Sequence, residues 1–200
     1  MASTKLCIGV LALQGAFAKH IQMLSRLGVN AIEVRYPEDL VRCDGLIIPG
    51  GESTVIMRQF RFIDLEKPFI EFAKTKPVFG TCAGLILMSR NIVDGASGFN
   101  LIDVTVERNA FGRQIESFET DVVFSPETGK KSDIPAIFIR APRIRHVGEK
   151  VTVLSRLNDE PVIVQQGIHL GATFHPELTD NSTLHLYFIH NVTKNKEHHG

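Results

Sequence analysis

A single cysteine between small residues is the strongest chemical signal in this sequence. Cys82 lies in the segment 80–84 (GTCAG), after the apolar run 77–79 and before the helix-like run 85–88. A strand, a tight turn that carries a nucleophile, and a helix together form a nucleophile elbow, in which glycines allow a strained backbone and close packing. The helix N-terminus beneath the sulfur favours a negative charge, and hence the reactive thiolate. The pattern therefore predicts Cys82 as a catalytic nucleophile.

A histidine and a carboxylate far downstream can complete such a site. His175 follows an apolar strand, precedes Pro176 and stands two residues before Glu177. In an extended segment residues i and i+2 share a face, so Glu177 can accept from one imidazole nitrogen while the other faces Cys82. A metal site made of the same three residues is disfavoured, because the sequence has neither C-x-x-C nor H-x-x-x-H spacing. No metal and no cofactor is therefore expected.

A glycine-rich turn ends another predicted core strand. In the segment 49–53 (PGGES), Gly51 can present its backbone N–H at little steric cost, and with the N–H of Ala83 it would form an oxyanion hole. Glu52 would offer a carboxylate to a cationic group of the substrate. Taken alone, the segment is equally compatible with a plain turn into a helix. Its place at the same edge of the sheet as the elbow favours a functional role.

Two arginines end predicted strands. Arg108 and Arg140 could be solvated strand ends, which is the commoner role for such residues. An amino-acid substrate would, however, need a partner for its carboxylate, and arginine supplies one.

The elements that must position these residues alternate between strand and helix in the first half. Runs 6–13, 31–34, 45–48 and 77–79 read as strands, and apolar residues at helical spacing predict a helix over 17–27. This alternation predicts a parallel, doubly wound sheet, and thus an α/β fold. In the second half, short strands follow one another without helices, which predicts antiparallel additions. These strands are expected at 103–108, 115–124, 136–140, 151–154, 162–165 and 167–174, before a closing helix from about Asn181.

Size and composition restrict the class of protein. The 200 residues suit a single domain, 1–200, with an ordered core of about 5–193 and a frayed polar tail over 194–200. The formal net charge of zero argues against a broad nucleic-acid or membrane surface, and no apolar stretch has the length of a transmembrane helix. Three cysteines, Cys7, Cys43 and Cys82, suggest a reducing compartment, here taken as the cytoplasm, and the first two read as buried hydrophobes.

Six segments together resemble one family in order, over most of the chain from Lys5 to about Val192. They are 13–15 (LQG), 49–54 (PGGEST), 80–84 (GTCAG), 106–114 (VERNAFGRQ), 138–142 (FIRAP) and 174–178 (FHPEL). The elbow and the His-Pro-Glu segment are similar to class I (triad) glutamine amidotransferases in general. The blocks 106–114 and 138–142 narrow the resemblance to the PdxT/SNO family, the glutaminase subunits of pyridoxal 5′-phosphate synthase.

The resemblance implies a class I glutamine amidotransferase-like, flavodoxin-like fold of three layers with a mostly parallel central sheet and added antiparallel strands. It implies a triad of Cys82, His175 and Glu177. Gln14 takes the place of a residue that couples the site to a partner. Glutamine binding maps onto Gly51, Glu52, Ser53, Arg108, Ile139 and Arg140.

The implied activity is hydrolysis of L-glutamine to L-glutamate and ammonia for vitamin B6 synthesis. The implied partner is a (β/α)8-barrel synthase in a large hetero-oligomer, with no nucleic acid and no membrane. We expect low activity from the isolated chain, and a flip of the Gly50–Gly51 peptide on docking that completes the oxyanion hole.

Three other interpretations remain open at this point. The chain could serve a different amidotransferase, in histidine or purine synthesis. It could be a related cysteine hydrolase acting on peptides or small aldehydes, which would not need the arginine pair. It could also be a non-catalytic docking subunit, which the intact set of Cys82, His175 and Glu177 disfavours.

Overall fold

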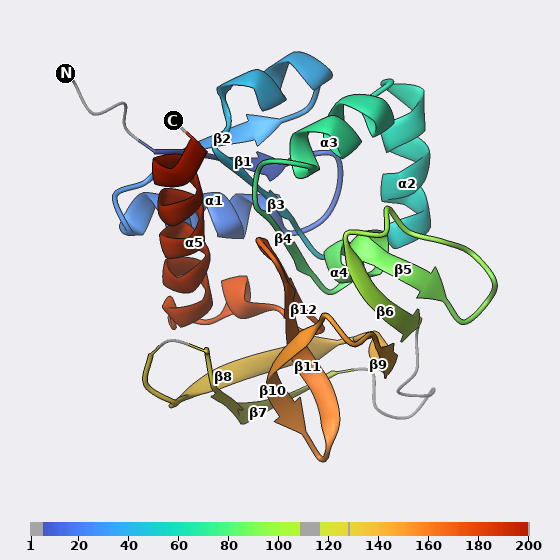
Figure 1. Ribbon diagram of the computed structural model, residues 1–200, viewed down its shortest axis with the longest axis vertical. Helices are drawn as coiled ribbons and strands as arrows, with labels where there is room; N and C mark the ends of the chain where they lie inside the picture. Colours follow the sequence, from blue (N-terminus) through green and yellow to red (C-terminus); the bar gives the residue numbers. More distant parts are fainter. Residues whose placement is uncertain (1–5, 109–116, 128, 200) are drawn as a thin grey trace.

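The computed structural model describes residues 6–108, 117–127 and 129–199, and within them a seven-stranded sheet forms the centre of the fold (Figure 1). Its strand order is β10-β11-β12-β4-β3-β1-β2. The run from β12 to β2 is parallel, whereas β10, β11 and β12 pair in antiparallel fashion. The strands of this sheet are β1 (Cys7–Leu11), β2 (Asn30–Val34), β3 (Gly45–Ile48), β4 (Val78–Thr81), β10 (Thr152–Leu157), β11 (Glu160–Gln166) and β12 (His169–Ala172).

Helices cover both faces of the sheet, with α1 and α5 on one side and α2, α3 and α4 on the other (Figure 1). The helical segments are α1 (Phe17–Arg26), η1 (Pro37–Arg42), α2 (Ser53–Phe62), α3 (Glu66–Ala73), α4 (Ala83–Met88), η2 (Pro176–Leu178) and α5 (Thr183–His199). None of the helices in the described ranges is long and apolar enough to cross a membrane.

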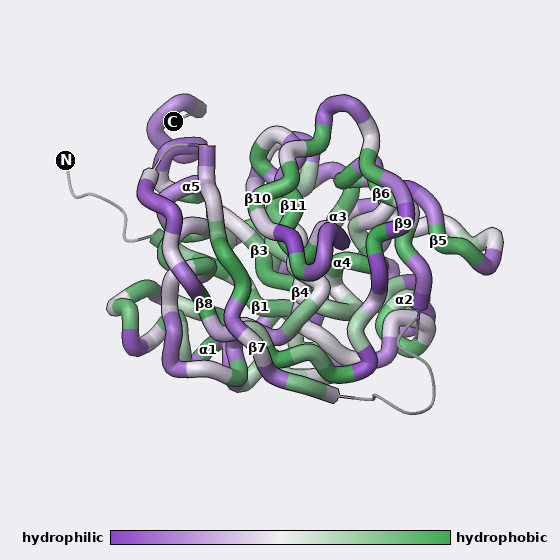
Figure 2. The backbone as a smooth tube through the Cα atoms, turned by 90° about the horizontal axis from the view of Figure 1, so that it is seen from below, coloured by the Kyte–Doolittle hydropathy of each residue, from purple (hydrophilic) through white to green (hydrophobic). Residues whose placement is uncertain are grey.

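Alternate residues of the parallel strands feed two separate hydrophobic clusters. In β3, Leu46 and Ile48 pack with the α2–α4 side, whereas Ile47 packs with the α1–α5 side; in β4, Val78 and Phe79 divide in the same way. A strand that is buried on both faces must be apolar at every position, which explains the continuous apolar runs of the sequence. Figure 2 shows the hydrophobic course of β3 and α4 inside the molecule and a hydrophilic C-terminal end of α5.

Smaller sheets extend the parallel core, as the second half of the sequence predicts. The described residues form an antiparallel ribbon of β7 (Ser117–Phe124) and β8 (Ser132–Ile139). They also form a sheet of β5 (Ser89–Ile92), β6 (Ile102–Glu107) and β9 (Arg143–Val147). The mostly parallel sheet with antiparallel additions confirms the expected α/β fold.

Sequence reasoning missed two strands and misjudged the tail. It did not predict β5 or β9, whose pairing with β6 depends on contacts distant in sequence. The expectation of a frayed tail over 194–200 was wrong for the described residues 194–199, because α5 continues to His199. Side chains hold this end in place: Asn195 Nδ2 donates to the carbonyl of Thr75 at 2.8 Å, and Lys196 pairs with Asp44 at 2.9 Å.

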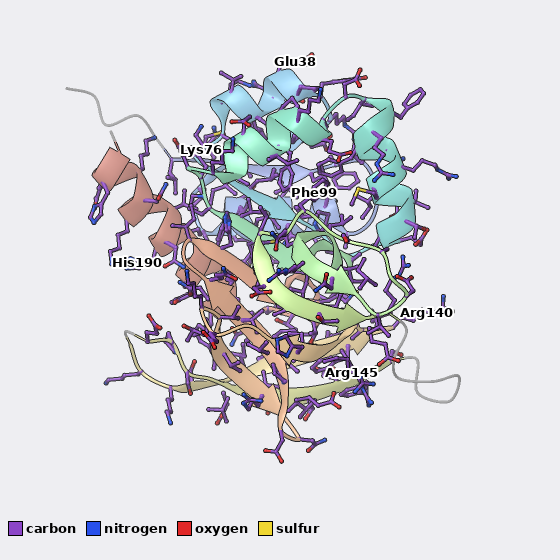
Figure 3. All side chains as sticks on the ribbon, turned by 45° about the vertical axis from the view of Figure 1, so that its right-hand side comes forward. Glu38, Lys76, Phe99, Arg140, Arg145 and His190 are labelled. Carbon is purple, nitrogen blue, oxygen red and sulfur yellow. The ribbon has the colours of Figure 1, made fainter. Side chains whose placement is uncertain are left out.

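The loop between β5 and β6 is tied to the elbow helix. The N–H of Phe99 donates to the carbonyl of Leu87 at 2.7 Å, and the N–H of Leu101 donates to that of Met88 at 2.9 Å. The Phe99 ring, labelled in Figure 3, packs against Phe60 of α2 at 5.1 Å between ring centroids. This loop therefore holds α4 against the layer formed by α2 and α3.

The carboxyl ends of β1, β3, β4 and β12 meet at one edge of the sheet, where ligands bind in open α/β folds. Each of these strands is followed by a segment that the sequence analysis selected. The turn at 49–53 follows β3, Cys82 follows β4, and His175 lies three residues beyond β12.

Candidate active site

Cys82 lies on a strained turn between β4 and α4. Its φ of 49° and ψ of −106° place a non-glycine residue in a conformation that few side chains adopt. Its N–H donates to the carbonyl of Ala172 at 2.9 Å, which ties the turn to β12. A Cβ on Gly84 would stand 2.1 Å from the carbonyl oxygen of Ile48, so only glycine lets the helix approach the strand so closely. The geometry is that of a nucleophile elbow.

His175 and Glu177 lie directly beside the elbow. The imidazole Nδ1 of His175 is 2.7 Å from Glu177 Oε1, and the ring also hydrogen-bonds the Cys82 side chain. The backbone N–H of His175 donates to the carbonyl of Ile137 in β8 at 2.8 Å, which fixes the position of the ring. The structure thus brings together the three side chains that the sequence analysis selected.

The backbone route to this pair differs from the expected one. The sequence analysis placed His175 and Glu177 in one extended segment, whereas Pro176–Leu178 forms the short 3-10 helix η2. Pro176 favours this turn because its fixed φ suits the first position of a helix. The tight turn, and not strand alternation, places the Glu177 carboxylate against the imidazole.

Burial and mutual attraction set the charge of the pair. Burial alone would lower the pKa of His175, but hydrogen bonds and charge attraction from Cys82 and Glu177 outweigh it and raise the pKa to about 10. Burial alone would raise the pKa of Glu177, but the neighbouring imidazoles of His20 and His175 hold it below its usual value. The site therefore favours an imidazolium next to a carboxylate.

A cavity of about 650 Å³ opens above the sulfur and is large enough for an amino acid. Cys82 and His175 lie at its floor. The other selected residues that line it are Gln14, Gly51, Glu52, Ser53, Arg108, Ile139 and Arg140. The structure thus assembles one pocket from segments as far apart in sequence as 14 and 175.

Ala83 lies beneath this pocket as the first residue of α4, where a backbone N–H has no partner within the helix. Its position directly after the nucleophile is the one expected of an oxyanion-hole donor. The carbonyl oxygen of Ile139, the last residue of β8, lies 3.8 Å from Cys82 Sγ. Arg140 follows at a φ of 45° and lies at the edge of the molecule (Figure 3).

Two charged residues of the pocket already have partners within the chain. The Glu52 carboxylate caps α2, where it accepts from the N–H and the hydroxyl of Thr54 and from the N–H of Val55. The hydrogen bond from the Thr54 hydroxyl is the main reason that the pKa of Glu52 lies below its usual value. Arg108 forms an ion pair with Asp94. Neither the cap nor the pairing with Asp94 was predicted from the sequence.

The turn at 49–53 is held by the segment that follows β1. Gln14 Oε1 accepts from the N–H of Glu52 at 2.7 Å, and the N–H of Ala16 donates to the carbonyl of Gly50 at 3.2 Å. Gly15 has a φ of 94°, and a Cβ there would lie 1.8 Å from the Gly50 oxygen. Gln14 is therefore in direct contact with the loop that carries Gly51.

Two buried histidines behind the site also escaped the sequence analysis. His20 of α1 and His185 of α5 are fully buried beside Glu177. A signal was available for His20, because it stands on the apolar stripe of its helix, three residues after Phe17 and four before Leu24. A histidine in such a stripe needs polar partners from elsewhere in the fold.

The remaining two cysteines are buried hydrophobes, as expected. Burial raises the pKa of Cys7 and raises that of Cys43 to about 12. Both thiols are free, and because their pKa is raised they stay protonated at neutral pH, which argues against a role in nucleophilic attack. Of the block 106–114, only the residues up to Arg108 belong to the described residues; 109–114 lie outside them.

The fold and the geometry of the site define a glutamine amidotransferase of the class I type. A solved structure of a glutamine amidotransferase from Thermotoga maritima matches with a TM-score of 0.57 over 87% of this chain and 77% of that one, at 14% identity, which shows the fold alone. A more similar solved structure, also described as a glutamine amidotransferase, has a TM-score of 0.86 and 44% identity over 93% of this chain and 98% of that one.

Residues 10–194 match the SNO glutamine amidotransferase family, and the chain belongs to that family. A curated relative from Halalkalibacterium halodurans, named pyridoxal 5′-phosphate synthase subunit PdxT, is 50% identical over 94% of this chain and 96% of its own length. A relative of the same name from Thermotoga maritima is 46% identical over 92% of this chain and 98% of its own length. The family expected from the six segments is confirmed.

Proposed function

We propose that this chain hydrolyses L-glutamine to L-glutamate and ammonia with the triad Cys82, His175 and Glu177, and supplies the ammonia to a pyridoxal 5′-phosphate synthase. One observation carries the proposal. Among the described residues, one strained turn presents a thiol, that of Cys82, to the pocket. This thiol lies against the imidazole of His175, whose other nitrogen is hydrogen-bonded to the buried carboxylate of Glu177. This is the arrangement that activates a cysteine nucleophile.

In the first half of the reaction, the Cys82 thiolate attacks the side-chain amide carbon of glutamine. The imidazolium of His175 then gives its proton to the departing nitrogen, which leaves as ammonia, and a γ-glutamyl thioester remains on the sulfur. A pKa of about 10 keeps this proton on the imidazole at neutral pH, ready for the leaving group. Glu177 holds the ring in the orientation that directs the other nitrogen toward Cys82.

In the second half, neutral His175 takes a proton from water, and the resulting hydroxide attacks the thioester. Glutamate leaves and the thiolate returns. Both halves pass through an oxyanion, for which the N–H groups of Ala83 and Gly51 are the proposed donors. Ala83 is fixed by α4, whereas Gly51 belongs to an exposed loop.

The second donor explains how a partner could control the reaction. The Gly50 carbonyl accepts a hydrogen bond from the N–H of Ala16. In the next peptide, the N–H of Glu52 donates to Oε1 of Gln14. A flip of the Gly50–Gly51 peptide would have to break the first of these bonds. We propose that docking of the synthase on the segment around Gln14 drives this flip, so that glutamine is consumed only where ammonia is used.

Arg108, Arg140 and Glu52 are the proposed partners for the charged α-carboxylate and α-ammonium of glutamine. Ser53 and the backbone at Ile139 complete the pocket. The acceptor of the ammonia is proposed to be a (β/α)8-barrel synthase in a hetero-oligomer, and the cytoplasm the compartment, where the three free thiols would stay reduced.

The test is a glutaminase assay of the purified chain with and without its cognate synthase. The proposal expects little ammonia from the chain alone and a large increase on addition of the synthase. Full activity of the isolated chain would contradict control by the partner. A complex that made no ammonia from glutamine would contradict the function itself.

A further inference from the structure

A chain of buried polar side chains continues behind the proposed triad. The free carboxylate oxygen of Glu177, Oε2, lies 3.3 Å from Nε2 of His20. On the other side of the His20 ring, Nδ1 lies 2.9 Å from Nε2 of His185. The contacts thus run from the Cys82 side chain through His175, Glu177 and His20 to His185, and they join the elbow to η2, α1 and α5.

This inner part of the chain is sealed from solvent. The side chains of His20 and Glu177 are both 0% exposed, and His185 is fully buried. The Phe79 ring lies against both histidines, with centroids 6.5 Å from that of His20 and 6.1 Å from that of His185. Solvent therefore cannot reach Oε2 of Glu177, and this oxygen must be stabilised by protein groups.

Hydrogen-bond satisfaction selects one arrangement of protons. Glu177 Oε2 is a buried oxygen without a hydrogen bond in the described part of the chain, although Nε2 of His20 lies 3.3 Å from it in an ion-pair contact. That nitrogen hydrogen-bonds the Thr81 hydroxyl, also at 3.3 Å, and a small turn of the His20 ring would direct its N–H to the bare carboxylate oxygen. With that proton on Nε2, Nδ1 of His20 must accept, so His185 donates from its own Nε2. The bare nitrogen of His185 is then Nδ1, the atom that lacks a partner among the described residues.

We propose that His20 is a positioning residue for the triad: its Nε2–H donates to Glu177 Oε2, and His185 fixes the tautomer in which it can do so. The inference rests on the proposed function, because it gives His20 its effect only through Glu177 and His175. It assigns a role in the reaction to two histidines that touch neither the substrate pocket nor the sulfur.

The electrostatics agree with neutral donors. Burial lowers the pKa of His20, and it lowers that of His185 to about 3, so both rings are uncharged at physiological pH. A neutral donor stabilises the Glu177 carboxylate without competing with the His175 imidazolium for its charge. Glu177 therefore stays ionised in a buried site and keeps the imidazolium in place.

The chain offers a matched pair of amide variants for the test. In His20→Gln the amide nitrogen can occupy the place of Nε2 and still donate to Glu177, whereas in His20→Asn the amide reaches only the place of Nδ1, next to His185. Both are measured in the full chain with its cognate synthase. We expect His20→Gln to keep kcat near the wild type and His20→Asn to lose roughly ten- to hundredfold in kcat with little change in KM.

A pH profile separates positioning from packing. The groups that face His20 are Glu177 and His175 from the segment after β12, His185 from α5 and the Thr81 hydroxyl from β4. Loss of the donor makes the ionised carboxylate less stable, so the acidic limb of kcat/KM should move to higher pH in His20→Asn and not in His20→Gln. His169 is a largely buried histidine that does not belong to this row of buried polar side chains. In His169→Gln the acidic limb of kcat/KM should therefore stay in place.

Equal activity losses in His20→Gln and His20→Asn, or an acidic limb that moves in neither, would overturn the inference. Thermal unfolding of both variants shows whether the fold survives, and His185→Leu gives a second test, with an expected smaller loss of kcat. Glu177→Gln distinguishes the two proposals. If it keeps full activity, the triad itself is wrong; if it loses activity while His20→Asn does not, only the role of His20 is wrong.

Discussion

The floor and the rim of the pocket are built in opposite ways. On the floor, Cys82, His175 and Glu177 are 6%, 7% and 4% exposed, and backbone hydrogen bonds to Ala172 and Ile137 fix the first two. On the rim, Gly51, Glu52, Ile139 and Arg140 are exposed to solvent. The triad is thus buried and its first two members are fixed by backbone hydrogen bonds, whereas the exposed rim carries the residues proposed for binding and, in Gly51, the second oxyanion donor.

The two regions also differ in how their charges are used. On the floor, the imidazole of His175 and the carboxylate of Glu177 face each other. On the rim, the charged groups have other neighbours as partners: Glu52 caps α2 and Arg108 pairs with Asp94. If Glu52 and Arg108 bind glutamine as proposed, the substrate must compete with these internal partners. Substitutions in the floor should therefore lower kcat, and substitutions of the charged rim side chains should change KM.

The largest expected effect comes from the sulfur itself. Cys82→Ala removes the nucleophile and should lower glutamine hydrolysis by about 10⁴-fold or more, since no other group can form the thioester. Ammonia release in the presence of the synthase measures the loss, and thermal unfolding should show a folded protein. Cys43→Ala is the matched control: it removes a buried thiol that does not line the pocket, and it should lower the unfolding temperature while each folded molecule keeps its activity.

The next effect tests the buried carboxylate. Glu177→Gln keeps the shape of the side chain but removes the charge opposite the imidazolium, so the pKa of His175 should fall. We expect kcat to drop by about 10²- to 10⁴-fold, the range of general acid–base catalysis, at nearly constant KM. A rise in KM with an unchanged kcat would instead place Glu177 among binding residues and erase the contrast between floor and rim.

A pair of opposite effects tests the rim. Arg108→Ala should raise KM for glutamine by roughly tenfold or more, because a charge-assisted contact is lost. Asp94→Ala should lower KM, because the guanidinium loses its ion pair with Asp94. Steady-state kinetics of both variants, with Arg90→Ala as a control that removes an exposed pair with Asp103, measure the difference. Parallel changes in Arg108→Ala and Asp94→Ala would show that the ion pair is purely structural.

The smallest effect concerns the stability of the floor against pH. The pKa of His175 rises from 6.5 to about 10 on folding, so its contribution to stability is present in full below about pH 6.5 and is lost as the pH rises through about 10. The free energy of unfolding, measured with urea across this window, should therefore fall with rising pH. In Cys82→Ala the fall should be shallower, because the attraction of the sulfur is missing. Equal slopes would contradict the coupling of His175 to Cys82.

The sequence was sufficient for the floor because its signals are local. Small residues around Cys82, and a histidine two residues before a carboxylate, follow buried strands whose carboxyl ends must share an edge. The other contacts depend on how distant elements meet. Arg108 pairs with Asp94, which is 14 residues away in the sequence. His20 contacts His185, which is 165 residues away. No local pattern fixes such meetings, nor the pairing of β9 with β6.

The most direct test of the triad is covalent labelling of the chain, in complex with its synthase, by a glutamine analogue that carries an electrophilic ketone. Intact-mass measurement and peptide mapping would locate the label. We expect one label, on Cys82 and not on Cys7 or Cys43, with protection by glutamine and loss of labelling in Cys82→Ala. A complex that releases ammonia from glutamine while Cys82 stays unlabelled, or that carries the label on another residue, would contradict the central claim.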